Sequence, residues 1–65
     1  MSVDLLQLDL EALRRLAEEW GLPAYRADQL YHALYAEKQF DFARMTNLPV
    51  ALRERLAAEA VIALP

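Results

Sequence analysis

Apolar residues recur at intervals of three or four positions in three stretches of this chain, the spacing of amphipathic helices. The first stripe begins at Leu10, directly after Asp9, whose carboxylate suits the N-cap of a helix. It ends before Gly21, the only glycine and a residue type that commonly closes a helix in a left-handed conformation. We expect a helix over residues 10–20 and an apolar arm, residues 1–8, packed against it.

The second stripe includes Leu30 and Leu34 and predicts a helix over residues 26–36. Pro23 marks the connector before it. The polar face of this helix is expected to carry Arg26, Asp28, Gln29, His32 and Ala33.

The third stripe, Leu52, Leu56 and Ala60, follows Pro49, which suits the first position of a helix because its missing N–H is not needed there. We expect the polar residues between these positions, Arg53 among them, to be exposed. A short helical turn should precede the helix, with Asp41 as its N-cap and with Phe42 and Met45 pointing inward.

Composition supports an all-helical chain. Ala and Leu account for 25 of the 65 residues, whereas Val, Ile and Thr total five. There is no Cys, so the packing of one small core must supply nearly all the stability. The predicted fold is all-α: a single domain over residues 1–65, a bundle of three to four short helices, with residues 61–65 as the start of a linker.

The net charge of −3 argues against a generic polyanion binder. The charge is uneven, however: the acidic residues concentrate in the first third, and residues 44–56 carry three arginines against one glutamate. No apolar run reaches the length needed to span a membrane, and no basic leader precedes an apolar stretch. A cytoplasmic protein is the expectation.

Side chains for catalysis are scarce. His32 is the only histidine and Ser2 the only serine, and there is no glycine-rich loop, so we expect neither a catalytic residue nor a metal site. Aromatic side chains can stack on RNA bases, but core packing is favoured for Trp20, Tyr31 and Tyr35.

Arg26 and Gln29 lie one helical turn apart, and two interpretations stay open: a helix-start pair bound to local partners, or an edge that contacts RNA. For one of Thr46 and Asn47, just before the last helix, a role as a cap or in an Asx turn is favoured. Their backbone N–H groups would still offer a phosphate a docking point. Arg44 and Arg53 flank this turn as cations free to bind a partner.

Two stretches together resemble a known family. Residues 23–31, Pro-Ala-Tyr-Arg-Ala-Asp-Gln-Leu-Tyr, and residues 41–53, with Met-Thr-Asn-Leu-Pro at their centre, are similar to the N-terminal accessory domain of the RlmN/Cfr family. These are radical S-adenosylmethionine RNA methyltransferases. The resemblance covers nearly the whole chain.

The resemblance implies a helix-hairpin-helix-like domain ahead of a catalytic barrel that is not part of these residues. It implies a 4Fe-4S cluster and S-adenosylmethionine in the parent enzyme, neither held here, and ribosomal RNA and tRNA as substrates methylated at an adenine carbon. The implied RNA-binding residues are Arg26, Gln29, Asn47 and Arg53. Arg44, a cation beside the same turn, joins the candidate set because of its position and not because of the resemblance. Two positions depart from the family pattern, which often has Lys where Asp28 stands and Trp where Ala33 stands.

Two other interpretations remain. The acidic balance also suits a helical protein–protein interaction module, similar to ubiquitin-binding domains. A purely structural cap on apolar surface of the barrel is the second. The hypothesis favoured by the two stretches is a domain that binds and orients RNA.

Overall fold

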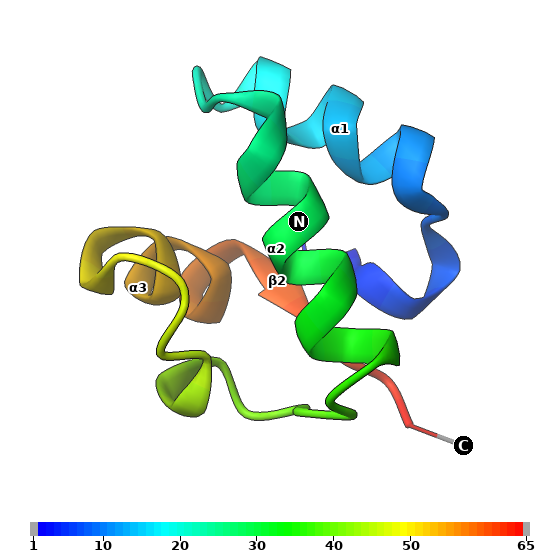
Figure 1. Ribbon diagram of the computed structural model, residues 1–65, viewed down its shortest axis with the longest axis vertical. Helices are drawn as coiled ribbons and strands as arrows, with labels where there is room; N and C mark the ends of the chain where they lie inside the picture. Colours follow the sequence, from blue (N-terminus) through cyan, green and yellow to red (C-terminus); the bar gives the residue numbers. More distant parts are fainter. Residues whose placement is uncertain (1, 65) are drawn as a thin grey trace.

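Three short α-helices enclose one apolar core in the computed structural model, which describes residues 2–64 (Figure 1). They are α1 (Leu10–Glu19), α2 (Ala24–Tyr35) and α3 (Val50–Glu59). Two single-turn 3-10 helices, η1 and η2, and two short strands, β1 and β2, complete the chain. The all-α prediction is confirmed, and the strands are an addition that the sequence pattern did not indicate.

Local chemistry sets both ends of α1 as predicted. The Asp9 carboxylate accepts a hydrogen bond from the Ala12 N–H at 2.8 Å. At the other end, Gly21 has φ +71°, and its N–H donates to the Glu18 carbonyl while the Leu22 N–H donates to Ala17. These two bonds form a Schellman motif, which turns the chain sharply toward α2.

Helix α2 begins two residues earlier than the pattern predicted. Pro23 is its N-cap, with φ −61° and ψ 149°, and makes no side-chain capping bond. Because a proline φ already suits entry into a helix, Ala24 and Tyr25 join the first turn. The helix packs against α1 (Figure 1). Its residues Ala27, Leu30 and Leu34 belong to the core.

The predicted turn before α3 is confirmed in part. Asp41 caps η2 (Phe42–Arg44) by accepting from the Ala43 N–H at 3.0 Å, and Met45 is buried while Phe42 is half-buried. Pro49 is the N-cap of α3 and not its first helical residue. Leu52, Leu56 and Ala60 are buried, as their spacing predicted.

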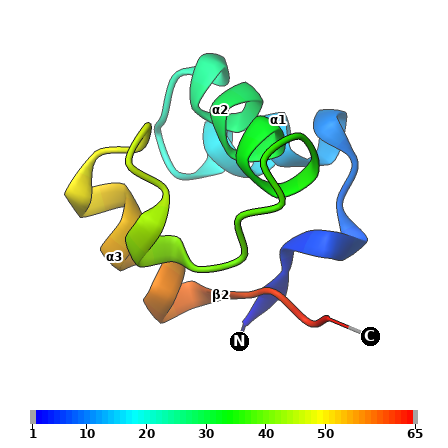
Figure 2. The ribbon, with the colours of Figure 1, turned by 60° about the horizontal axis from the view of Figure 1, so that its bottom comes forward.

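The N-terminal arm joins the opposite end of the described chain. Strand β1 (Val3–Asp4) pairs in parallel with β2 (Ala60–Val61), Val3 opposite Ala60, and Figure 2 shows the two segments side by side. The arm continues into η1 (Leu5–Gln7), where Leu5 is fully buried. Val61, placed by the sequence at the start of a linker, therefore belongs to a strand, whereas Met1 and Pro65 lie outside the described residues.

Helix α2 is rotated relative to the face that the pattern assigned to it. Ala33, expected on the polar face, has no exposed surface, and Tyr31 and Tyr35, favoured for the core, are 36% and 42% exposed. Helix α2 packs against α1, and its core-facing residues are Ala27, Leu30, Ala33 and Leu34, so its buried face is centred on these residues and not on the tyrosines. Trp20 packs against the core as predicted.

Candidate functional site

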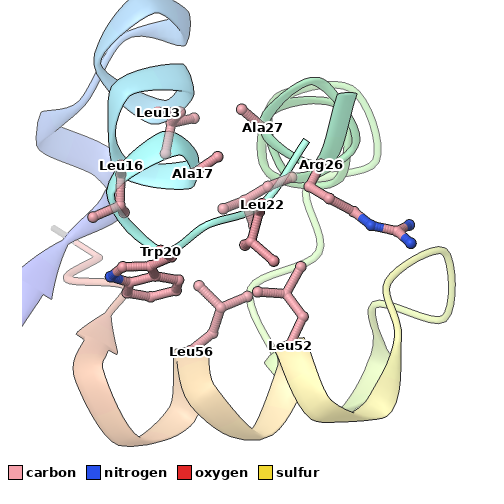
Figure 3. Close-up of a pocket in the computed structure, with 10 residues that line it drawn as sticks. Leu13, Leu16, Ala17, Trp20, Leu22, Arg26, Ala27, Leu52 and Leu56 are labelled. Atoms are coloured by element: carbon pink, nitrogen blue, oxygen red, sulfur yellow. The ribbon is translucent and has the colours of Figure 1, made fainter. Parts of the chain in front are cut away.

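The two polar residues singled out on α2 bind each other. Arg26 Nη1 donates to Gln29 Oε1 at 2.9 Å, and the Arg26 guanidinium lies 4.7 Å from the centroid of the Tyr25 ring. Figure 3 shows the stem of Arg26 at the edge of the apolar interior and its guanidinium pointing away from it. The apolar stem is half-buried, while the charged end is held at the surface by local partners.

Asn47 connects the turn before α3 to the same helix. Its side-chain amide donates to the backbone carbonyl of Gln29 at 3.2 Å, across 18 positions of the sequence. The capping role favoured for Thr46 or Asn47 is wrong, because α3 has no side-chain cap and its N-cap is Pro49. Asn47 therefore fixes the loop against α2 and extends the polar row that Arg26 and Gln29 begin.

Arg44 adjoins this row from the end of η2. It is exposed and lines a polar hollow of about 220 Å³ together with Thr46 and Asn47. Gln39 and Glu37 also line the hollow. Arg44 therefore lies beside Asn47, and Glu37 is the carboxylate among the residues that line this hollow.

Arg53 was predicted to be exposed, but the structure places it partly out of contact with solvent. Its Nη1 donates to the Ala43 carbonyl at 2.8 Å, which joins α3 to η2, and the residue is half-buried. Its Nε is buried and has no hydrogen-bond partner among the described residues. Arg53 is therefore partly a structural residue whose remaining guanidinium N–H groups can still meet an acceptor.

The ion pairs divide the basic residues into two groups. Arg14 pairs with Asp28 at 2.9 Å, Arg15 with Glu11 at 2.8 Å, and Arg55 with Glu59 at 2.7 Å. Within residues 2–64 these are the ion pairs formed, so the three arginines predicted to contact RNA are the three that no carboxylate neutralises. We call the five residues Arg26, Gln29, Arg44, Asn47 and Arg53 the arginine row. Two hydrogen bonds and a shared hollow link the first four, whereas Arg53 lines a separate hollow together with Glu54.

Backbone electrostatics add to the positive potential of this side. Helices α2 and α3 both begin at a proline that makes no side-chain cap, and Pro23 and Pro49 line one common groove. The first-turn N–H groups of a helix carry about half a positive charge. Two such ends therefore lie near Arg26.

The other residues weighed for chemistry lie apart from the row. His32 is exposed on the flank of α2 that faces α1, where it lines a hollow of about 450 Å³ with Tyr31, Tyr35 and Arg14. The rings of Tyr31 and Tyr35 are 4.6 Å apart. Among the residues described, no cluster of three His, Asp or Glu side chains could hold a metal ion.

Residues 3–62 match the profile of the family described as "Ribosomal RNA large subunit methyltransferase N-terminal domain". The chain belongs to this family. The similarity expected from the two sequence stretches is confirmed.

Curated relatives agree with this membership. Proteins named "Probable dual-specificity RNA methyltransferase RlmN" from Roseiflexus sp. (strain RS-1) and Roseiflexus castenholzii (strain DSM 13941 / HLO8) are 47% and 45% identical over 92% of this chain. A protein of the same name from Dictyoglomus thermophilum (strain ATCC 35947 / DSM 3960 / H-6-12) is 37% identical over 83% of it. The chain spans about 15% of the length of these relatives.

The two departures from the family pattern have separate structural explanations. Asp28 forms the ion pair with Arg14 on the flank facing α1, away from the arginine row. Ala33 is enclosed by the core, so this member of the family fills that space with a methyl group.

One residue beside the row was missed by the sequence reasoning, which treated Tyr25 as part of a connector. Its ring is 52% exposed and carries the Arg26 guanidinium. The sequence did indicate that Tyr25 would be exposed, because in a helix position 25 lies on the face opposite the apolar positions 27, 30 and 34.

Proposed function

We propose that this domain binds RNA through the arginine row and orients it for an RlmN-type enzyme that methylates adenine carbon 2 in 23S ribosomal RNA and tRNA. The observation that carries the proposal is the pairing pattern: three arginines form no ion pair within residues 2–64. Two of them, Arg26 and Arg44, adjoin the amide side chains of Gln29 and Asn47. Guanidinium and amide donors are the groups that hold phosphate and sugar oxygens. The names of the relatives support RNA as the partner.

In this proposal the domain itself performs no catalysis. The remainder of the parent protein would hold the 4Fe-4S cluster and S-adenosylmethionine and carry out the methyl transfer in the cytoplasm. No helix within residues 2–64 combines the length and the apolar character needed to cross a bilayer.

The test compares RNA affinity across salt concentrations in the full-length protein. Arg26→Gln combined with Arg44→Gln should weaken binding and reduce the slope of log affinity against log salt by about one unit per lost phosphate contact. Arg14→Gln combined with Arg15→Gln removes the same charge from ion-paired positions and is the matched control. Equal effects of the two double variants, or no effect of the first, would refute docking through the row.

Arg53 is tested separately because it also supports the fold. Arg53→Lys keeps the charge but removes the planar group that reaches Ala43. If Arg53 contacts phosphate mainly as a charge, this variant should bind RNA with nearly unchanged salt dependence. Thermal unfolding, followed by circular dichroism, reports the structural part of its role.

A structural role on the opposite flank has one observation in its favour. Tyr31 and Tyr35 are exposed beside the 450 Å³ hollow. Because the chain spans about 15% of the length of its relatives, the rest of a longer protein would be available to cover them. We expect Tyr31→Ser with Tyr35→Ser to lower the unfolding temperature of the full-length protein more than that of this domain alone if the rest of the enzyme packs there. Equal decreases would argue against such a contact.

A further inference from the structure

An apolar groove lies between the beginnings of α2 and α3, next to the arginine row. Its volume is about 330 Å³, at the lower end of the range of about 300–1,000 Å³ found for ligand sites. Pro23, Pro49 and the side chains around them form its floor, and Tyr25, Arg26 and Arg55 stand at its rim. Leu22 and Leu52 line the groove and also pack in the core. Pro23, Pro49 and Ala51 are exposed, so the groove presents an apolar surface that a flat apolar group could contact.

Tyr25 is the aromatic side chain of this rim. One side of its ring is taken by the Arg26 guanidinium, 4.7 Å from the centroid, and the residue is 52% exposed. The contact with Arg26 restrains the ring without covering it, because an exposure of about half leaves ring surface accessible. A restrained, exposed ring is a suitable surface for stacking a nucleobase.

The charge around the groove favours an anionic ligand. Arg55 is neutralised by Glu59 and lies 4.3 Å from the Trp20 ring, whereas Arg26 is in none of the ion pairs within the described residues. No carboxylate is among the described residues that line the groove. A ligand seated there thus meets one uncompensated positive charge beside an aromatic ring, the combination that suits a nucleotide.

We infer that Tyr25 and Arg26 form a stacking site for one unpaired nucleobase, which gives the domain a preference for single-stranded or looped RNA over duplex RNA. The base would stack on Tyr25 while its phosphate meets Arg26. In a duplex both faces of a base are covered by neighbouring base pairs, so duplex RNA could use the row but not this site. The inference rests on the proposed function and adds the class of RNA that the domain selects.

The experiment measures binding of the full-length protein to a short unstructured RNA and to a blunt duplex of equal length, by fluorescence anisotropy. Tyr25→Leu should weaken binding of the unstructured RNA by about 5- to 150-fold, the range for loss of one stacked base. Duplex affinity should change by no more than about twofold, as for a neutral surface substitution. The salt slope should not change, because the substitution removes no charge. Tyr25→Phe keeps the ring and should bind like the unaltered protein.

Tyr35→Leu is the matched control, since it removes an exposed tyrosine from the other flank of the same helix. Equal weakening by Tyr25→Leu and Tyr35→Leu would overturn the inference, and so would equal weakening on both RNA forms. If Tyr25→Leu instead lowered the unfolding temperature of the full-length protein and left RNA binding intact, the groove would be a contact within the protein and the inference wrong.

The outcome separates this inference from the proposed function. Suppose that Arg44→Gln weakens the binding of both RNAs and that Tyr25→Leu has no effect. Docking through the arginine row would then be supported, and the stacking site would be refuted. If Arg26→Gln combined with Arg44→Gln left the affinity for both RNAs unchanged, both proposals would be wrong.

Discussion

The Asn47 amide donates a hydrogen bond to the backbone carbonyl of Gln29 and so holds the turn before α3 against the middle of α2. This contact joins the two sequence stretches that define the arginine row. We expect Asn47→Ala to destabilise the domain by about 0.5–1.5 kcal/mol, the net value of one such hydrogen bond. Urea unfolding measures the change, and Thr46→Ala, at the exposed neighbouring position, is the control.

The same substitution should also weaken RNA binding, because Arg44 and Asn47 share one hollow and depend on the position of the loop. Asn47→Asp would retain size while placing a negative charge beside Arg44. If Asn47→Asp bound RNA as well as the unaltered protein, the hollow would not face phosphate.

Two positions have a positive φ, and substitutions there should change the stability of the domain in opposite directions: replacing the glycine at one should lower it, and introducing a glycine at the other should raise it. Gly21 has φ +71° and Lys38 has φ 52°, a conformation that costs residues with a Cβ about 1–2 kcal/mol. Gly21→Ala should therefore destabilise the domain by about 1 kcal/mol, although its new methyl group would meet no atom within 4 Å. Lys38→Gly should stabilise it, by less than that because glycine loses more freedom on folding. Thermal unfolding of both variants gives the signs, and equal signs would contradict this account.

Ala33 should not accept tryptophan, the larger residue that the resemblance suggests for this position. Its side chain is fully buried between α2 and the segments that cover it. Ala33→Trp would overpack this space, at a cost of about 1–3 kcal/mol or more. The neighbouring exposed position supplies the control, since His32→Trp should be tolerated. A stable, well-folded Ala33→Trp domain would show that the core can open locally.

Leu5 should matter to stability as much as any residue of the three helices. It has no exposed surface, so Leu5→Ala should cost about 2–5 kcal/mol, enough to unfold much of a domain of this size. Leu64→Ala, at a residue that is 56% exposed, should have little effect. Circular dichroism at increasing temperature compares them, and similar unfolding temperatures would mean that the arm is not part of the core.

The sequence carried enough information for the existence of the three helices and for both ends of α1. Asp9, Gly21 and Asp41 act within a few residues of themselves, so local chemistry alone predicts them. The strands β1 and β2 have two residues each and no alternating pattern. Their pairing depends on where the packed helices place the two ends of the chain. The spacing of apolar residues gives no information about that placement.

The candidate site shows the same division. The identity of its residues followed from the two family-like stretches, but which arginines stay unpaired did not. Arg14 reaches Asp28 only because α1 and α2 pack side by side, and Arg53 turns to Ala43 only because η2 folds back on α3. The exposure of Tyr25 and Tyr35 likewise depends on which flanks of α2 the other segments cover.

The β1–β2 pairing has a consequence for synthesis on the ribosome. The Ala63 N–H approaches the Asp4 carboxylate from 59 positions away, and β1 has no partner until β2 has emerged. At about 5–20 residues per second, the first strand must wait about 3–12 seconds after its own synthesis. During that interval the helices can form, but Leu5 has no closed core to enter. A nascent chain that stalls within α3 would therefore display this leucine to chaperones.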